Sequence, residues 1–306
     1  MNVRIIPRLD IKGPNLVKGI HLEGLRVLGR PEDFARHYYE TGADELFYQD
    51  SVASLYGRNS LLEIVARTAR EIFIPLCVGG GLRNLDDIRA VLRAGADKVA
   101  LNTAVTKNPE LIHQAARAFG SSTIVVAIEA IRGSDGRWLC YTDCGREETG
   151  VEATQWAQRA AEMGAGELLV TSVDREGTGK GFDLELTSAI ATVVGIPVIA
   201  HGGAGKMEHI HRVISEGRAD AVAMASMLHY GCYRQFAADG RDFSGEGNTM
   251  FIKAERIFTR METAGIQDIK RYLSERDILC RWEGDGIPGV ELYRQWCETV
   301  GEQVSK

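Results

Sequence analysis

Acidic side chains follow short apolar runs at four places in the sequence: Asp10, Asp50, Glu129, and Asp174 or Glu176. Carboxylates are rarely buried without a partner, so packing alone explains these positions poorly. Two carboxylates held on either side of a ligand can donate and accept protons in general acid–base chemistry. Asp10 and Glu129 are the best candidates for this role. The alternative is that they pair with Lys12 and Arg132 and only hold loops in place.

Two glycine-rich turns have the composition of phosphate-binding loops. One contains Gly80 and Gly81, and the other contains Gly202 and Gly203. Glycine lets backbone N–H groups approach an anion, and the start of the following helix adds a favourable dipole. Hydroxyls stand at the neighbouring strand ends, on Thr103 and Ser226. A single glycine turn can serve only as a tight turn, but two equivalent turns predict a ligand with a phosphate at each end. A protonated His201 would strengthen the second site.

Four charged residues stand at the starts of predicted strands rather than at their ends: Arg4, Glu45, Lys98 and Glu167. Two acids and two bases at these positions can meet as a ring of ion pairs at the bottom of a barrel. The alternative is a charged rim that stays solvated.

The elements that position these residues repeat along the chain. Residues 74–105 resemble residues 196–228, and Gly80 falls on Gly202, 122 residues later. RIIPRLDIKG resembles IVVAIEAIRG about one repeat later, which pairs Asp10 with Glu129. Each half contains four strand–helix units, so the duplication predicts an α/β fold, a (β/α)8 TIM barrel built from two half-barrels, about 1–122 and 123–230.

The predicted barrel forms a single domain over residues 1–306. Eight strand–helix units need about 250 residues, so the remainder is predicted to be an insertion at about 231–266 and a tail at about 282–306. The segment from Lys12 to about Arg30 is glycine-rich and is predicted to be a long irregular loop. Long loops in compact domains tend to be functional.

The composition favours a cytoplasmic protein without a metal or another cofactor. The net charge of -6 and the absence of a basic block argue against nucleic acid or an anionic membrane as partner. No apolar run reaches the roughly 18 residues of a membrane span, and no signal peptide precedes Asn2. The six cysteines form no CxxC pair, as expected in a reducing compartment. Cys140 and Cys144 lack the accompanying histidine pair of a zinc site.

Longer stretches carry a family resemblance and cover residues 4–231 almost without gaps: RIIPRLDIK, GADELFYQDSVAS, FIPLCVGGGLR, GADKVALNTAV, KNPELI, FGSSTIVVAIEA, GAGELLVTSVDREGT, GFDLEL, IPVIAHGGAG and MASMLHYG. Together they resemble the HisA/HisF barrel family. The GADEL, VDREGT and GFDLEL stretches are more similar to its cyclases, subunits of imidazole glycerol phosphate synthase, than to its isomerases.

The resemblance implies an enzyme of the lyase class in histidine biosynthesis. Its substrate would be a ribulosyl formimino carboxamide nucleotide with a phosphate at each end. Ammonia would come from a HisH-like glutaminase subunit, bound as a heterodimer, and would travel through the barrel. The products would be imidazole glycerol phosphate and aminoimidazole carboxamide ribotide.

The resemblance also implies roles for individual residues. Asp10 and Glu129 correspond to the two catalytic acids. Residues of the substrate and phosphate sites correspond to Gly81, Asn102, Thr103, Asp174, Glu176, Gly177, Gly203 and Ser226. The ring that gates ammonia entry corresponds to Arg4, Glu45, Lys98 and Glu167. Asp97 stands where the family contacts its glutaminase.

Four positions depart from the family pattern, and one of them is Glu176, which stands where the family motif DRDGT has its second aspartate. Glu129 replaces an aspartate, Arg8 replaces a cysteine, and His201 replaces a small residue. The longer side chain at position 129 moves the carboxylate by about 1.5 Å, and a displacement of about 1 Å can cost on the order of 100-fold in rate. These departures leave an alternative function, in which a paralogue passes ammonia to a sugar amidotransferase in surface-polysaccharide biosynthesis.

Overall fold

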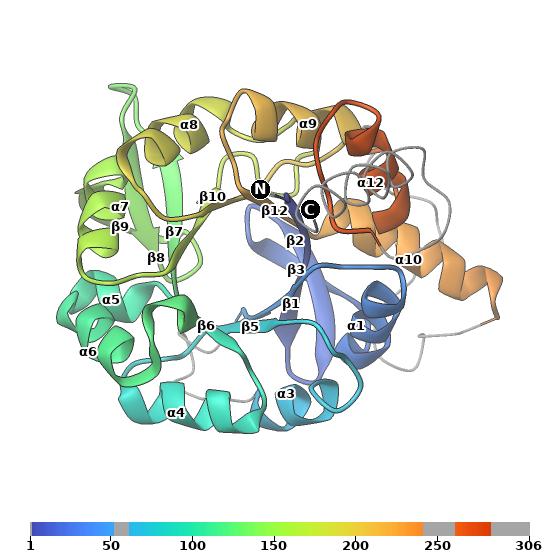
Figure 1. Cartoon of the computed structure of the whole chain (residues 1–306), viewed down its shortest axis with the longest axis horizontal. Helices are drawn as coiled ribbons and strands as arrows, with labels where there is room; N and C mark the ends of the chain where they lie inside the picture. The colour runs from blue at the N-terminus through green and yellow to red at the C-terminus, as the bar shows by residue number, and fades with distance from the viewer. Residues whose placement is uncertain (1, 52–60, 241–260, 283–306) are drawn as a thin grey trace, which may run out of the picture.

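Eight parallel strands close into a barrel in the computed structural model, which describes residues 2–51, 61–240 and 261–282. Neighbouring strands pair in chain order, and the last pairs with the first. The strands are β1 (Arg4–Lys12), β4 (Leu46–Asp50), β5 (Leu76–Gly79), β6 (Lys98–Leu101), β7 (Ile124–Arg132), β10 (Glu167–Ser172), β11 (Val198–His201) and β12 (Ala221–Met224). Helices surround them (Figure 1), which confirms the predicted (β/α)8 barrel.

The surrounding helices are α1 (Pro31–Glu40), α3 (Leu62–Thr68), α4 (Leu85–Ala94), α5 (Thr103–Lys107), α6 (Glu110–Phe119), α7 (Ala153–Glu162), α8 (Leu184–Val193), α9 (Met207–Ser215), α10 (Ser226–Ala238) and α12 (Ile266–Ser274). Helix α4 shows how local sequence sets their limits. The Asn84 side chain caps its start, and Gly95, with φ of 116°, ends it. Within the described ranges, none of the helices is both long and apolar enough to cross a bilayer.

Alternate residues of the strands face the barrel interior and fill it with side chains. A buried layer near the strand starts contains Ile6, Phe47, Cys77, Val125, Leu169, Ile199 and Ala221. The small residues Ala100, Ala127 and Ala223 follow one step nearer to the C-terminal ends of their strands. The interior is therefore tightly packed near the base and has more room beside these alanines at the C-terminal mouth.

Two antiparallel hairpins extend the barrel at equivalent points of the repeat. Strands β2 (Asn15–Ile20) and β3 (Glu23–Gly29) follow β1, and β8 (Trp138–Thr142) and β9 (Glu147–Glu152) follow β7. The prediction of an irregular loop from Lys12 to about Arg30 was wrong. Its glycines obscure the strand pattern, whereas pairing with β1 and burial of residues such as Leu16 and Leu28 stabilise the hairpin.

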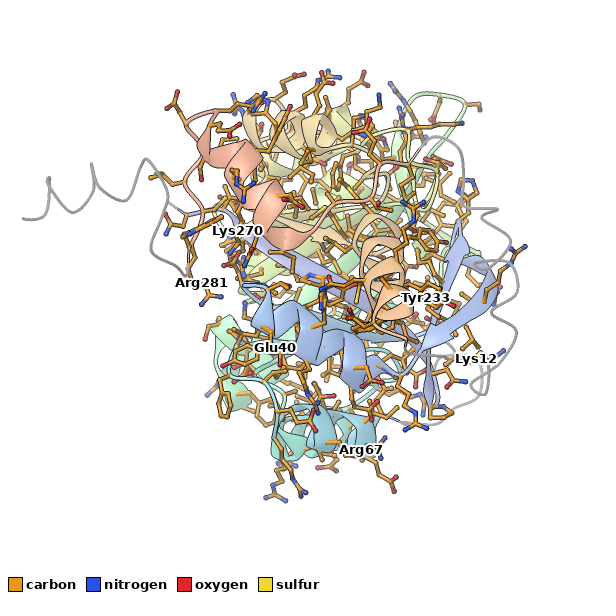
Figure 2. The ribbon with its side chains drawn as sticks, turned by 90° about the vertical axis from the view of Figure 1, so that its right-hand side faces the viewer. Lys12, Glu40, Arg67, Tyr233, Lys270 and Arg281 are labelled. Atoms are coloured by element: carbon orange, nitrogen blue, oxygen red, sulfur yellow. The ribbon has the colours of Figure 1, made fainter. Side chains whose placement is uncertain are left out.

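The end of the described chain is tied to the base of the barrel. Lys270 on α12 forms an ion pair with Asp44 at 2.7 Å, and Arg281 donates to the same carboxylate at 2.9 Å. Figure 2 shows Lys270 and Arg281 on the side of the barrel away from Lys12 and the first hairpin. Helix α10 continues to Ala238, so residues 231–238 of the predicted insertion are helical. Residues 241–260 and the tail from residue 283 lie outside the described residues.

Candidate functional site

The two candidate catalytic acids lie at the C-terminal mouth, on opposite sides of the barrel. Asp10 is on β1 and Glu129 is on β7, four strands away in either direction. Both side chains are buried, with 3% and 8% of their surface exposed. The repeat therefore places the pair as the sequence predicted.

Asp10 lies between two cations. Arg8 Nε donates to its Oδ1 at 3.0 Å, and Lys18 Nζ lies 3.5 Å from its Oδ2. Burial alone would raise the pKa of Asp10, but the charges of Arg8 and Lys18 lower it to about 2. Asp10 is therefore a carboxylate at neutral pH. The alternative pairing with Lys12 does not form, since Lys12 is exposed and Asp10 is bound by Arg8 and Lys18.

Glu129 has a different environment, and its protonation differs accordingly. Burial raises its pKa to about 7, although the charge of Arg8 and a hydrogen bond from the Gly145 backbone N–H partly oppose the rise. The nitrogen of Gly145 lies 2.9 Å from Glu129 Oε2. The mouth thus contains one permanent carboxylate and one acid that titrates near neutral pH. Two acids with separated pKa values are suited to a base and an acid in one reaction.

Arg8 contacts both Asp10 and His201, and its charge also acts on Glu129. Its guanidinium also lies over the ring of Phe47, at 5.8 Å from the centroid, and it donates to His201 Nδ1 at 3.2 Å. Because Nδ1 accepts this bond, the imidazole is neutral and its proton is on Nε2. Burial and the Arg8 charge lower the pKa of His201 well below its usual value. The expectation that a protonated His201 strengthens anion binding was therefore wrong.

Lys18 is a site residue that the sequence analysis missed. The β2–β3 hairpin carries it over the mouth, where its ammonium forms a short ion pair with Glu176. Glu176 also accepts a hydrogen bond from Leu22 N at 3.0 Å. A strand pattern around Leu16 and Val17 would have been the only local signal, because the partners of Lys18 come from elsewhere in the chain.

The first predicted anion site opens into a cavity of about 570 Å³. Gly80, Gly81, Asn102 and Thr103 line it together with Glu129. The cationic residues of its lining are Arg83, Lys107 and Arg146, and none of them was predicted as a site residue from the sequence. Gly80 has φ of +101°, and a Cβ there would lie 2.6 Å from the Asp50 carbonyl oxygen, so only glycine permits this turn.

The second predicted anion site is much smaller. A pocket of about 20 Å³ is lined by Glu176, Gly177, His201, Gly203 and Ser226, among others. Its volume is roughly what one water molecule needs and is too small for a phosphate group. Asp174 lines neither of these two pockets, and its carboxylate instead accepts a hydrogen bond from Arg132 N at 3.0 Å. The two halves of the repeat are therefore equivalent in sequence but unequal in the space they offer.

The four charged residues at the strand starts form a closed ring at the opposite end. Arg4 contacts Glu45 at 2.7 Å and Glu167 at 3.0 Å, and Lys98 contacts the same two acids at 2.9 and 3.1 Å. The ion-pair ring expected from the sequence is thus present. Burial raises the pKa of Glu45 despite its two cationic neighbours. Glu45 Oε1 is buried and has no hydrogen-bond partner among the described residues.

Asp97 lies near this ring, at the start of β6, and is exposed. Its carboxylate accepts a hydrogen bond from Leu76 N at 2.9 Å. Asp44 and Asp220 make the same type of bond, to Ile5 N and Val198 N. The observed contact of Asp97 therefore aligns the start of the neighbouring strand.

Comparison with known proteins finds one matching family and close relatives of this chain. The model of the family described as histidine biosynthesis protein matches residues 4–234. A protein of Legionella pneumophila named imidazole glycerol phosphate synthase subunit HisF is 60% identical over 210 residues, which are 69% of this chain and 99% of that protein. A protein of the same name from Trichormus variabilis is 49% identical over 234 residues, 76% of this chain and 91% of its own length.

Proposed function

We infer the function from one premise: the chain belongs to the histidine biosynthesis protein family. Within this family we propose that it is the cyclase subunit of imidazole glycerol phosphate synthase, an enzyme of the lyase class that acts in the cytoplasm. Its high identity to two proteins named as this subunit supports the assignment. So does the pair of carboxyl groups, because Asp10 and Glu129 occupy the strand ends at which the reaction would take place.

The proposed reaction joins ammonia to the ribulosyl formimino carboxamide nucleotide and releases imidazole glycerol phosphate, aminoimidazole carboxamide ribotide and one molecule of water. A nitrogen nucleophile must lose protons as it attacks carbon, and departing groups must gain them. The Asp10 carboxylate is suited to accept a proton, and a protonated Glu129 is suited to donate one. Ammonia supplies the nucleophile and the substrate supplies the electrophilic carbon.

The observation that carries this proposal is the large cavity at the mouth, because it combines Glu129 with an anion site that contains Gly81, Asn102 and Thr103. A phosphate in that site would bring the attached sugar toward Glu129. The direct test is turnover of the purified protein with the bisphosphate nucleotide and ammonium salts, monitored by formation of both products. Absence of turnover at high ammonia concentration would contradict the proposal.

The phosphates of the substrate are proposed to bind at the two glycine turns. The first site needs no rearrangement, whereas the 20 Å³ pocket at Gly203 and Ser226 must widen before it can hold a phosphate. Gly177 and Glu176 line the same pocket. We therefore propose that the loop from Asp174 to Gly177 moves when substrate binds, and that the ion pair of Glu176 with Lys18 opens at the same time.

Loss of the hydroxyl at either site should weaken substrate binding. Thr103→Val and Ser226→Ala are each expected to raise KM for the bisphosphate about tenfold, since a hydrogen bond to a charged group contributes about 1.5–3 kcal/mol. Thr103→Ser, which keeps the hydroxyl, should stay near the wild-type value. Thr192→Val is the control, because Thr192 is exposed and its hydroxyl donates only to the Ser188 carbonyl of its own helix α8. An unchanged KM for Ser226→Ala would exclude the second site.

A glutaminase subunit is proposed to dock at the base of the barrel, where Asp97 and the ring of Arg4, Glu45, Lys98 and Glu167 lie. The buried Glu45 Oε1 supports this proposal, because ammonia is a hydrogen-bond donor and an unpartnered buried acceptor calls for an explanation. Ammonia would pass the ring and continue along the barrel axis to the mouth. The ring would then have to open transiently.

Removal of one ring cation should lower the activity with glutamine but not the activity with free ammonia. Lys98→Ala is expected to lower glutamine-dependent product formation several-fold in the presence of the glutaminase, while activity with free ammonia stays within about twofold. The reason is that Lys98 bridges Glu45 and Glu167 far from the catalytic mouth. Lys206→Ala, which removes an exposed lysine ion-paired with Glu262, is the control. Equal losses with both nitrogen sources would mean that the ring is only structural.

The alternative function, delivery of ammonia to a sugar amidotransferase, is not favoured. The relatives that share 60% and 49% identity carry the cyclase name. A protein that only conducted ammonia would also not need a titrating acid beside an anion site.

A further inference from the structure

Two hairpin tips have the same strained backbone at equivalent points of the repeat. His21 and Leu22, between β2 and β3, have φ of 51° and 62°. Asp143 and Cys144, which follow β8, have φ of 53° and 61° and lie 122 residues later. Positive φ is uncommon for residues other than glycine. Both halves of the barrel therefore keep this conformation at two consecutive non-glycine positions, although the side chains differ.

Each strained tip directs a backbone N–H at a buried carboxylate of the mouth. Leu22 N donates to Glu176 Oε2 at 3.0 Å. Gly145 N, directly after the Asp143–Cys144 pair, donates to Glu129 Oε2 at 2.9 Å. Unfavourable backbone conformations persist where the surrounding structure requires them, and they cluster at active sites. The common feature of the two tips is thus a positioned donor rather than a particular side chain.

The second tip also contacts the first anion site. Asp143 N donates to Thr103 Oγ1 at 3.3 Å, and Cys144 Sγ lies 3.5 Å from the carbonyl oxygen of Ser51, which follows β4. Asp143 and Cys144 line the same 570 Å³ cavity as Thr103 and Glu129. Three consecutive residues of this turn are therefore in contact with the acid, with the anion site and with the residue that follows β4, three strands away from β7.

We propose that the turn Asp143–Cys144–Gly145 is a positioning element for Glu129, and that it orients this carboxyl group relative to a phosphate held at Thr103. The inference rests on the proposed function, because only a proton transfer at Glu129 makes its orientation important. Gly145 and Cys144 are positioning residues in this scheme and do not touch the reacting atoms. Substrate binding at Thr103 and the placement of Glu129 are thereby linked through a single backbone segment.

The charges around Glu129 indicate how its pKa would change if the hydrogen bond from Gly145 N were lost. Arg8 and Asp10 face it from β1, and Asp143 and Cys144 face it from the turn. Arg8 and the Gly145 N–H favour its ionised form, whereas burial and the two aspartates oppose ionisation. Displacement of the N–H therefore shifts Glu129 toward the protonated state, so its pKa should rise.

Gly145→Ala is the variant that tests the inference. Gly145 has φ of +77°, and an added Cβ would lie 3.0 Å from Val173 Cγ1, so Val173 or the turn must shift by a few tenths of an ångström. We expect the turn to take up part of this shift and to carry the Gly145 N–H with it. Gly136→Ala is the matched control, because Gly136 lies in the β7–β8 connection with φ of +84° and its Cβ would meet no atom within 4 Å. Both variants incur the strain of a left-handed alanine, but only Gly145→Ala disturbs Glu129.

Two measurements on the full-length protein are required. Carbon-13 NMR titration of glutamate carboxyl groups, assigned with Glu129→Gln, should show the Glu129 midpoint raised by about one pH unit in Gly145→Ala, a tenfold change in acid dissociation. The midpoint should be unchanged in Gly136→Ala. Turnover with ammonia should fall about tenfold or more in Gly145→Ala, mainly in kcat, with its high-pH decline displaced by the same amount.

An unchanged Glu129 midpoint in Gly145→Ala, or equal changes in both glycine variants, would overturn the inference. Normal kcat in Gly145→Ala despite a shifted midpoint would also overturn it, because orientation of Glu129 would then be unimportant. Failure of the proposed function gives a different result, namely no turnover by the wild-type protein itself. The titration does not depend on substrate, so the two failures are distinguishable.

Discussion

Asp10→Asn should lower ammonia-dependent turnover by at least about 100-fold while the protein remains folded, because positioned acid–base groups contribute typically 10²–10⁴-fold. Arg8 and Lys18 keep Asp10 ionised, with a pKa of about 2, so it is unprotonated at neutral pH. A pKa this low also makes it a weak base, so its ion pairs must loosen before it accepts a proton. Asparagine keeps the shape and can still accept hydrogen bonds from both cations, but it has far lower basicity. The measurement is kcat with ammonium salts and the bisphosphate.

Thermal unfolding should accompany this measurement, because a buried charged partner is being removed. The loss of an ion-pair partner inside a protein can cost about 3–5 kcal/mol, although the amide oxygen of asparagine limits that cost here. Asp135→Asn makes the same chemical change at an exposed aspartate that is ion-paired with Arg137, and it should leave turnover unchanged. Wild-type turnover by a folded Asp10→Asn protein would remove Asp10 from the mechanism.

Glu129→Gln should lower kcat/KM about 100-fold, and it should also abolish the decline of kcat/KM above about pH 7. Burial raises the pKa of Glu129 to about 7. The wild-type side chain is therefore protonated below that pH, and it has lost its proton above it. If Glu129 donates a proton, kcat/KM of the wild type, measured at a fixed concentration of unprotonated ammonia, is level below about pH 7 and falls tenfold per pH unit above it. Glutamine cannot donate in this way and does not titrate, so the residual activity should lack this decline.

Unfolding by denaturant gives an independent check on the same group. Glu129 has a pKa of about 7 in the folded protein and an ordinary pKa of 4.5 in the unfolded chain. Its contribution to the free energy of unfolding is therefore greatest below pH 4.5 and is lost as the pH rises toward about 7. The wild type should therefore lose about 3 kcal/mol more stability than Glu129→Gln between pH 4.5 and 7. If stability changes with pH in the same way in the wild type and in Glu129→Gln, and if Glu129→Gln keeps the decline in kcat/KM, then a group other than Glu129 causes the pH dependence.

The repeat made most of the fold predictable. Apolar strands separated by helical segments are local features, and a duplication of 122 residues shows which strands are equivalent. Position along a strand determines which end of a parallel barrel a side chain occupies. That rule correctly placed Asp10 and Glu129 at the mouth and Arg4 and Lys98 at the base, without knowledge of any contact.

The sequence by itself thus determined the barrel, its two halves and the ends at which the acids and the ring lie, because these depend on strand position alone. Only the tertiary structure decided the state of each group. Lys18 reaches Asp10 and Glu176 because a hairpin folds over the mouth, and Gly145 reaches Glu129 because a strained turn directs its N–H there. Burial and charge from distant segments set pKa values and pocket volumes, and no local pattern contains that information.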